Sequence, residues 1–160
     1  MLKEDILQKA VDAVGWPPAI DPCCDPLGSN ALAPLYYSAW QNSLLQHSSL
    51  LGADLIVNPP YSRIKEFLTL LNNLFEEDPE TRAILIVPHR ETKDKWFETL
   101  STDKKFRLLQ SWSSGSEMFT LPHKLLPLDL TKRYTKNATD ERITVWEMSR
   151  HNSDAENFNW

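Results

Sequence analysis

The chain has 160 residues, 41% of them hydrophobic, which fits one globular domain around one core. The only cysteines are the neighbours Cys23 and Cys24, and neither a signal peptide nor a membrane-length apolar run is present. We therefore expect an intracellular protein, cytoplasmic or nuclear, that is neither secreted nor inserted in a membrane. The formal net charge of −5 argues against a free-standing nucleic-acid-binding domain but allows an enzyme with a small basic rim.

The N-terminal third has one clear helical pattern. Residues 3–14 carry apolar side chains on one face, and Gly15 with the following Pro-Pro pair should end that helix. The stretch 21–30 follows a short apolar approach and is rich in turn residues. Residues 31–52 are ambiguous, and we expect an irregular or partly helical passage there.

The middle of the chain gives the strongest pattern. Residues 55–57 form a short, β-branched apolar run typical of a buried strand. Apolar residues then recur at helical spacing over 62–77, with Ser62 as the expected N-cap and an Asp-Pro pair at the end. A continuous apolar run at 83–88 predicts a strand covered on both faces. Strand, helix and strand in this order predict a βαβ unit with parallel strands.

The last third adds a short helix and two strands. We expect the helix over 94–100 and the strands over 106–112 and 142–148. The fold class is thus α/β: a small three-layer sandwich with a mostly parallel sheet. Residues 1–150 form one domain, and residues 151–160 form a polar C-terminal tail.

The stretch 54–61 reads Asp-Leu-Ile-Val-Asn-Pro-Pro-Tyr and places an extended, stiff elbow at a strand end, because proline lacks an N–H and fixes φ. Ligands of open α/β sheets bind outside the carboxyl ends of the strands. At such an end the Asn58 side-chain oxygen and the Pro59 carbonyl can accept hydrogen bonds from an exocyclic –NH₂ group. Tyr61 offers a ring for stacking. A structural turn without function is the alternative.

The tetrapeptide 58–61 matches the motif (Asp/Asn/Ser)-Pro-Pro-(Tyr/Phe/Trp) of amino-group methyltransferases. Over residues 15–148 the chain resembles the phage-type (Dam-like) DNA N6-adenine methyltransferases, relatives of which occur in mobile elements. The segments that carry the resemblance, in chain order, are "IDPCCDPLGSN", "YYSAWQNSLLQ", "DLIVNPPYSRIKEFL", "AILIVPHRETKDKWF" and "SGSEMF".

The resemblance implies a reduced, Rossmann-like methyltransferase sandwich that uses S-adenosylmethionine and flips the target adenine of DNA into a pocket. The target pocket and catalytic residues would be Asn58, Pro59, Pro60 and Tyr61. The cofactor would contact Asp21, Pro22, Cys23, Asn42 and Asn58. Substrate binding would involve Tyr61 and Arg90.

Other interpretations remain open. No Gly-x-Gly follows Asp21, which could be a turn or cap aspartate, so a non-catalytic module that binds nucleic acid or a partner is one alternative. The same tetrapeptide also occurs in RNA and protein-glutamine amino methyltransferases. No Cys or His set has metal-ligand spacing, so we predict no metal. The chain lacks room for a recognition domain, and we therefore expect a homodimer or a separate DNA-recognition partner.

Overall fold

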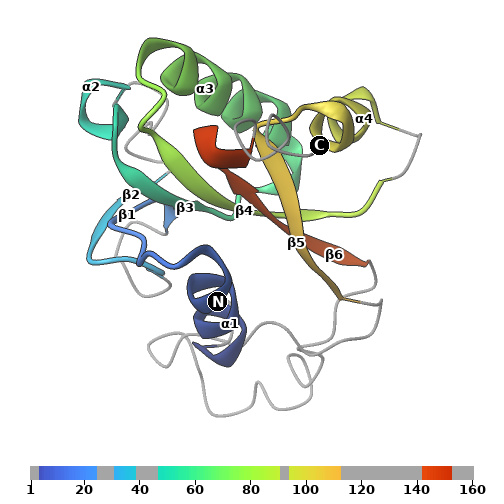
Figure 1. The fold of residues 1–160 in the computed structure, drawn as a ribbon, viewed down its shortest axis with the longest axis horizontal. Helices are drawn as coiled ribbons and strands as arrows, with labels where there is room; N and C mark the ends of the chain where they lie inside the picture. Colours follow the sequence, from blue (N-terminus) through green and yellow to red (C-terminus); the bar gives the residue numbers. More distant parts are fainter. Residues whose placement is uncertain (1–3, 25–30, 39–46, 91–93, 113–141, 153–160) are drawn as a thin grey trace, which may run out of the picture.

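A six-stranded sheet in the order β2-β1-β3-β4-β6-β5 forms the centre of the molecule (Figure 1). The computed structural model describes residues 4–24, 31–38, 47–90, 94–112 and 142–152. The strands are β1 (Ile20–Cys24), β2 (Leu35–Ser38), β3 (Asp54–Val57), β4 (Arg82–Pro88), β5 (Phe106–Trp112) and β6 (Ile143–Met148). The helices are α1 (Glu4–Val14), α2 (His47–Leu50), the 3₁₀ turn η3 (Tyr61–Arg63), α3 (Ile64–Glu77) and α4 (Lys95–Thr102).

The sheet is mostly parallel, as predicted. β2, β1, β3 and β4 pair in parallel, and only β6 runs against its neighbours β4 and β5. The predicted βαβ unit is β3-α3-β4. Its strands are in register from Asp54 opposite Arg82 to Val57 opposite Leu85. The predicted helices over 3–14 and 94–100 and the strands over 106–112 and 142–148 are also confirmed.

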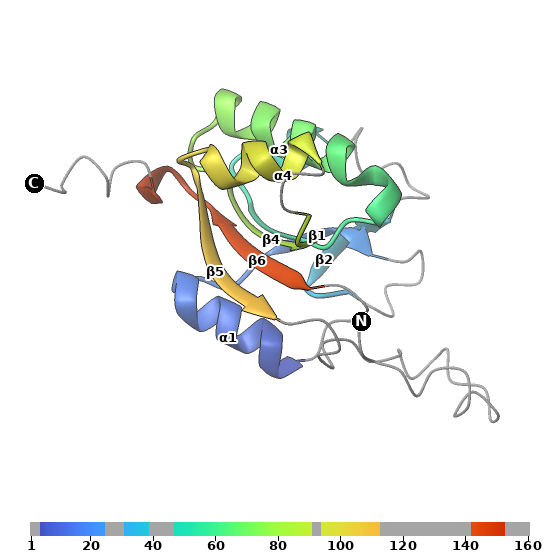
Figure 2. The same cartoon turned by 90° about the vertical axis from the view of Figure 1, so that its right-hand side faces the viewer.

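Helices cover both faces of the sheet, which gives the predicted three layers. α3 and α4 lie on one face and α1 lies on the other (Figure 2). One core cluster fills the space under α3 and α4, and it includes Phe67, Leu71, Leu85 and Trp146. A second cluster lies under α1 and includes Ile6, Ala10, Ile84 and Val145. Neighbouring residues of β4 therefore face different layers, because successive side chains of a strand alternate.

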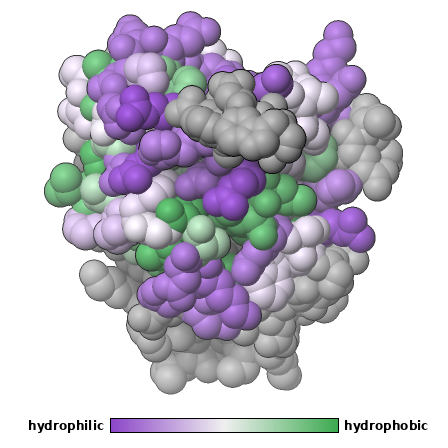
Figure 3. Space-filling model, viewed as in Figure 1, coloured by the Kyte–Doolittle hydropathy of each residue, from purple (hydrophilic) through white to green (hydrophobic). Residues whose placement is uncertain are grey.

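α3 follows its apolar periodicity closely. Its buried positions are Ile64, Phe67, Leu68, Leu70, Leu71 and Leu74. The part of the surface at the top of Figure 3 is mainly hydrophilic, in keeping with the exposed charged residues of α3. The predicted N-cap at Ser62 is wrong: Ser62 lies inside η3, and Arg63 precedes α3 without a side-chain cap. The backbone N–H of Arg63 instead donates to the Pro60 carbonyl at 2.9 Å, so a 3₁₀ turn starts the helix.

Two strands differ from the prediction. β1 continues through Asp21 and Pro22, where we expected turns, and β2 occupies part of the passage that we expected to be irregular or helical. Pro22 cannot donate to a neighbouring strand, and the β1–β2 register shifts between Asp21 and Cys24. This irregularity lets a central strand contain a proline.

Gly15 ends α1 in a left-handed conformation, with φ +82° and its N–H donating to the Val11 carbonyl at 2.9 Å. Apart from the two chain neighbours of Gly15, no atom of the described residues lies within 4 Å of the position that a Cβ would take. Gly15→Ala should therefore lower the free energy of unfolding through backbone strain alone, by about 1–2 kcal/mol. Urea unfolding measures this change. Gly15→Asn should lower the free energy of unfolding less than Gly15→Ala, because Asn tolerates this conformation. An equal decrease in both variants would contradict the explanation.

Among the described residues, no helix has the length and apolar character needed to cross a membrane. Residues 150–152 form a short helical turn after β6, and the rest of the expected polar tail lies outside the described residues.

Candidate functional site

The order of the strands reverses between β1 and β3. From β1 the chain goes to β2 on one side, while from β3 it goes to β4 on the other side. In open α/β sheets, ligands bind at such a switch point, outside the carboxyl ends of the strands. Ile20 of β1 is level with Leu55 of β3, so Cys23 and Asn58 each follow three residues later at the same edge. The topology therefore brings the predicted cofactor segment and the predicted elbow to adjacent strand ends.

The elbow has the predicted extended geometry. Pro60 has φ −55° and ψ 140° and is exposed, whereas Pro59 is buried and Asn58 is half-buried. No hydrogen bond to the Asn58 amide group occurs within the described part of the chain. A half-buried amide usually finds partners. The Asn58 side chain thus offers an acceptor and donors to a ligand at the switch point.

Tyr61 and Arg90, the two predicted substrate-binding residues, lie together. Tyr61 is 51% exposed, and the Arg90 guanidinium carbon lies 5.8 Å from the centre of its ring. Arg90 Nε is 3.6 Å from Asp94 Oδ2. A cation near the ring restrains the phenol, and the ring remains half-exposed at this edge of the sheet.

A hollow of about 270 Å³ adjoins this pair. Its lining residues are Tyr61, Ser62, Ile64, Lys65, Arg90, Asp94 and Trp96. No sequence pattern assigns Lys65, Asp94 or Trp96 to the site. The sequence signal for Trp96 is weak: it is an aromatic residue near the start of a helix that follows the end of a strand. Lys65 and Trp96 reach the hollow because α3 and α4 both begin at this edge.

Asp21 is only 2% exposed and points at the backbone of its own region. Its Oδ1 accepts from the Cys23 N–H and its Oδ2 accepts from the Leu32 N–H, both at 2.9 Å. The carboxylate therefore ties the backbone at Leu32 to β1. This arrangement makes Asp21 a residue that shapes the site, and direct contact with a cofactor stays a prediction.

Asp21→Asn tests this role. The amide nitrogen of Asn would face one of the two N–H groups, so the variant loses a buried hydrogen bond and gains a clash of donors. We expect the free energy of unfolding to fall by about 1–3 kcal/mol in urea titrations. Asp12→Asn is a matched control, because Asp12 is exposed and, among the described residues, accepts only from the Gln8 side chain. Equal losses in both variants would contradict the assignment.

The other predicted cofactor residues differ in position. Pro22 is buried in β1, and Cys23 is half-buried and packs against the core under α3. Asn42 lies outside the described residues. No group of His, Cys, Asp and Glu side chains in the described ranges could hold a metal ion.

Comparison with protein-family models and with curated proteins finds no match for this sequence.

Proposed function

We propose that the protein is an S-adenosylmethionine-dependent methyltransferase that modifies an exocyclic amino group, namely N6 of adenine in DNA. The observation that carries the proposal is the meeting of β1 and β3 at the switch point of the sheet. It brings the segment 21–23, proposed for the cofactor, to the same edge as the elbow 58–61, proposed for the target amine.

The proposed role of the elbow is to position the target amine. The Asn58 side-chain oxygen and the Pro59 carbonyl would each accept a hydrogen bond from one N–H of the amine, so that the nitrogen lone pair turns toward the methyl group. S-adenosylmethionine would supply that methyl group. Attack would break the bond between the methyl group and the cofactor sulfur and release the demethylated cofactor. The amine proton can then pass to water, so no strong base is required. Alignment of two bound reactants can account for roughly 7–11 kcal/mol of the barrier.

The groups beside the elbow favour a nucleic acid over a protein amide. Lys65 and Arg90 line the hollow together with Tyr61 and Trp96, so cations and aromatic rings stand side by side. This combination suits a phosphate backbone with unstacked bases. A base must leave the duplex to reach such an elbow, because the target atom is not accessible inside the stack.

Tyr61→Ala should raise the KM for DNA about tenfold to a hundredfold, because stacking of a base on an aromatic ring contributes about 1–3 kcal/mol. Tyr61→Phe keeps the ring, so its KM for DNA should stay close to that of the wild type. Methylation rates at varied DNA concentration measure both variants. If Tyr61→Phe loses as much as Tyr61→Ala, the ring is not the stacking surface.

Calorimetric titration of S-adenosylmethionine and its demethylated product tests the cofactor part. We expect micromolar binding, weakened at least about tenfold in Asp21→Asn because the chain beyond β1 loses its anchor. Asp12→Asn should bind like wild type. Absence of binding to folded wild-type protein would contradict the proposal.

A further inference from the structure

A second and larger hollow lies at the opposite edge of the sheet, where β3 and β4 begin. Its volume of about 600 Å³ is within the range of small-molecule sites. Its walls come from the end of α1, the starts of β4 and β5, and the end of β6 with the turn that follows. The lining residues are Val14, Trp16, Arg82, Lys104, Phe106, Arg107, Glu147, Ser149, His151 and Asn152.

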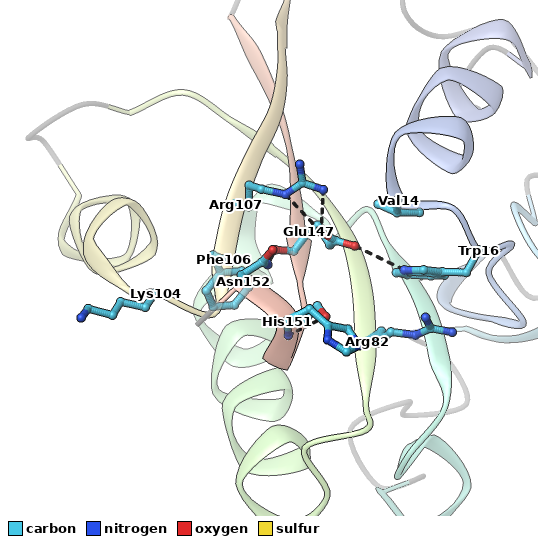
Figure 4. A pocket seen from close by; sticks show the side chains of 10 residues that line it. Val14, Trp16, Arg82, Lys104, Phe106, Arg107, Glu147, His151 and Asn152 are labelled. Atoms are coloured by element: carbon cyan, nitrogen blue, oxygen red, sulfur yellow. Dashed lines mark hydrogen bonds and ion pairs between the residues drawn. The ribbon is translucent and has the colours of Figure 1, made fainter. Parts of the chain in front are cut away.

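Two arginines of this cavity are held in place by carboxylates. Glu147 is buried, and its Oε1 accepts from Arg107 Nη2 at 2.9 Å and Nε at 3.3 Å. Its Oε2 accepts from Trp16 Nε1 at 3.3 Å (Figure 4). Arg82 donates from Nε and Nη2 to the two oxygens of Asp54, each at 2.8 Å. The Arg82 guanidinium also lies 4.7 Å from the centre of the Trp16 ring.

The turn after β6 forms another fixed wall. Asn152 Nδ2 donates to the carbonyls of Lys105 at 2.8 Å and Glu147 at 2.9 Å. The backbone N–H of His151 donates to Ser149 Oγ at 3.2 Å. The cavity is thus preorganised by contacts within the protein, which lowers the entropy loss on ligand binding.

The groups that remain available are mainly donors. Both Glu147 oxygens already accept, and so do both Asp54 oxygens, so a cationic ligand would have to displace an arginine. Nη1 of Arg82, Nη1 of Arg107 and the imidazole of His151 have no hydrogen-bond partner in the described ranges. The hydrogen bond to Asp54 raises the pKa of Arg82 above its ordinary value, so that side chain remains charged. Guanidinium donors fixed in this way match phosphate oxygens.

We propose that this cavity binds a phosphate-bearing ligand, with Arg82, Arg107 and His151 holding the phosphate. The apolar surfaces of Val14, Trp16 and Phe106 would accommodate the organic part of the ligand. Lys104 also lines the cavity, but its side chain extends away from the arginines (Figure 4). The inference is independent of the proposed methyl transfer, which concerns the opposite edge of the sheet.

Calorimetric titration of ribose 5-phosphate into the full chain at low salt tests the inference, because this probe has a phosphate and no base. We expect binding tighter than about 1 mM that weakens as salt is added. Ribose should not bind. Arg107→Gln should weaken binding about tenfold or more, the size expected for one charged hydrogen bond. His151→Gln changes an exposed side chain, so it tests the site even if Arg107→Gln does not fold.

Lys95→Gln is the matched control, because Lys95 is exposed on α4 and does not line the cavity. This variant should bind ribose 5-phosphate with the wild-type affinity. Asn58→Ala should also bind normally, and a loss there would place the phosphate at the other edge and overturn the inference. No binding by folded wild-type protein, equal binding of ribose, or unchanged affinity in both cavity variants would overturn it as well. Competition by a thymidine oligonucleotide would support a nucleic-acid strand as the source of the phosphate. Binding without such competition would support a free phosphorylated molecule.

Discussion

Asn58→Ala should lower the rate of methyl transfer to DNA about 10²–10³-fold, the loss seen when one preorganised hydrogen-bond partner of a reacting group is removed. The Asn58 amide follows β3 directly, is half-buried, and has no hydrogen-bond partner in the described part of the chain. In the proposed reaction the Asn58 side-chain oxygen accepts a hydrogen bond from the target amine. Alanine removes that acceptor but leaves both prolines, so the extended elbow should remain. Single-turnover rates with saturating S-adenosylmethionine measure the effect.

Asn73→Ala is the matched control, because Asn73 is an exposed asparagine of the neighbouring helix α3. It should keep the wild-type rate. Asn58→Asp separates the two roles of the amide group, because aspartate retains acceptor oxygens and lacks the amide donors. A wild-type rate in Asn58→Ala would show that the elbow does not position the amine.

Phe67→Ala should lower the free energy of unfolding by about 3–5 kcal/mol, the usual loss for a buried phenylalanine. Phe67 is 1% exposed and sits in the core cluster between α3 and the sheet. The same helix follows the elbow, so this packing also fixes where the elbow points. A natural domain is stable by only about 5–15 kcal/mol, so the variant should unfold at much lower urea concentration.

Phe75→Ala is the comparison within the same helix. Phe75 is only partly buried and packs against the outside of the cluster, so we expect a loss of about 1 kcal/mol. Urea titrations followed by circular dichroism measure both variants. Equal losses would mean that the centre of the core is not where the structure has it.

The sequence predicts the β3-α3-β4 unit because its apolar residues are continuous or periodic within one segment. It does not predict β2, a short edge strand whose Leu35 and Tyr36 are exposed, so no alternation marks it. It misplaces the end of β1 because Pro22 normally excludes a central strand, and only the irregular register with β2 accommodates it. Ser62 has the residue type of an N-cap, but the preceding prolines impose a 3₁₀ turn instead.

The sequence likewise predicts only some of the residues of the candidate site. Asn58, Tyr61 and Arg90 could be predicted because they follow strands, and parallel strands end at one edge. The backbone partners of Asp21 could not, since Leu32 approaches it only after the chain has returned from β1. The phosphate-type cavity has no sequence signature at all. Trp16 and Glu147, which share a hydrogen bond, lie far apart in the sequence.

Transfer of labelled methyl groups from S-adenosylmethionine to DNA is the most direct test of the proposed function. Oligonucleotides with and without adenine, single-stranded and duplex, are incubated with the protein, and the products are digested to nucleosides. We expect the label in N6-methyladenine only and in adenine-containing DNA only. Asn58→Ala should lose the label, and Asn73→Ala should keep it. Cofactor binding without label in adenine, or label that persists in Asn58→Ala, would contradict the proposed function.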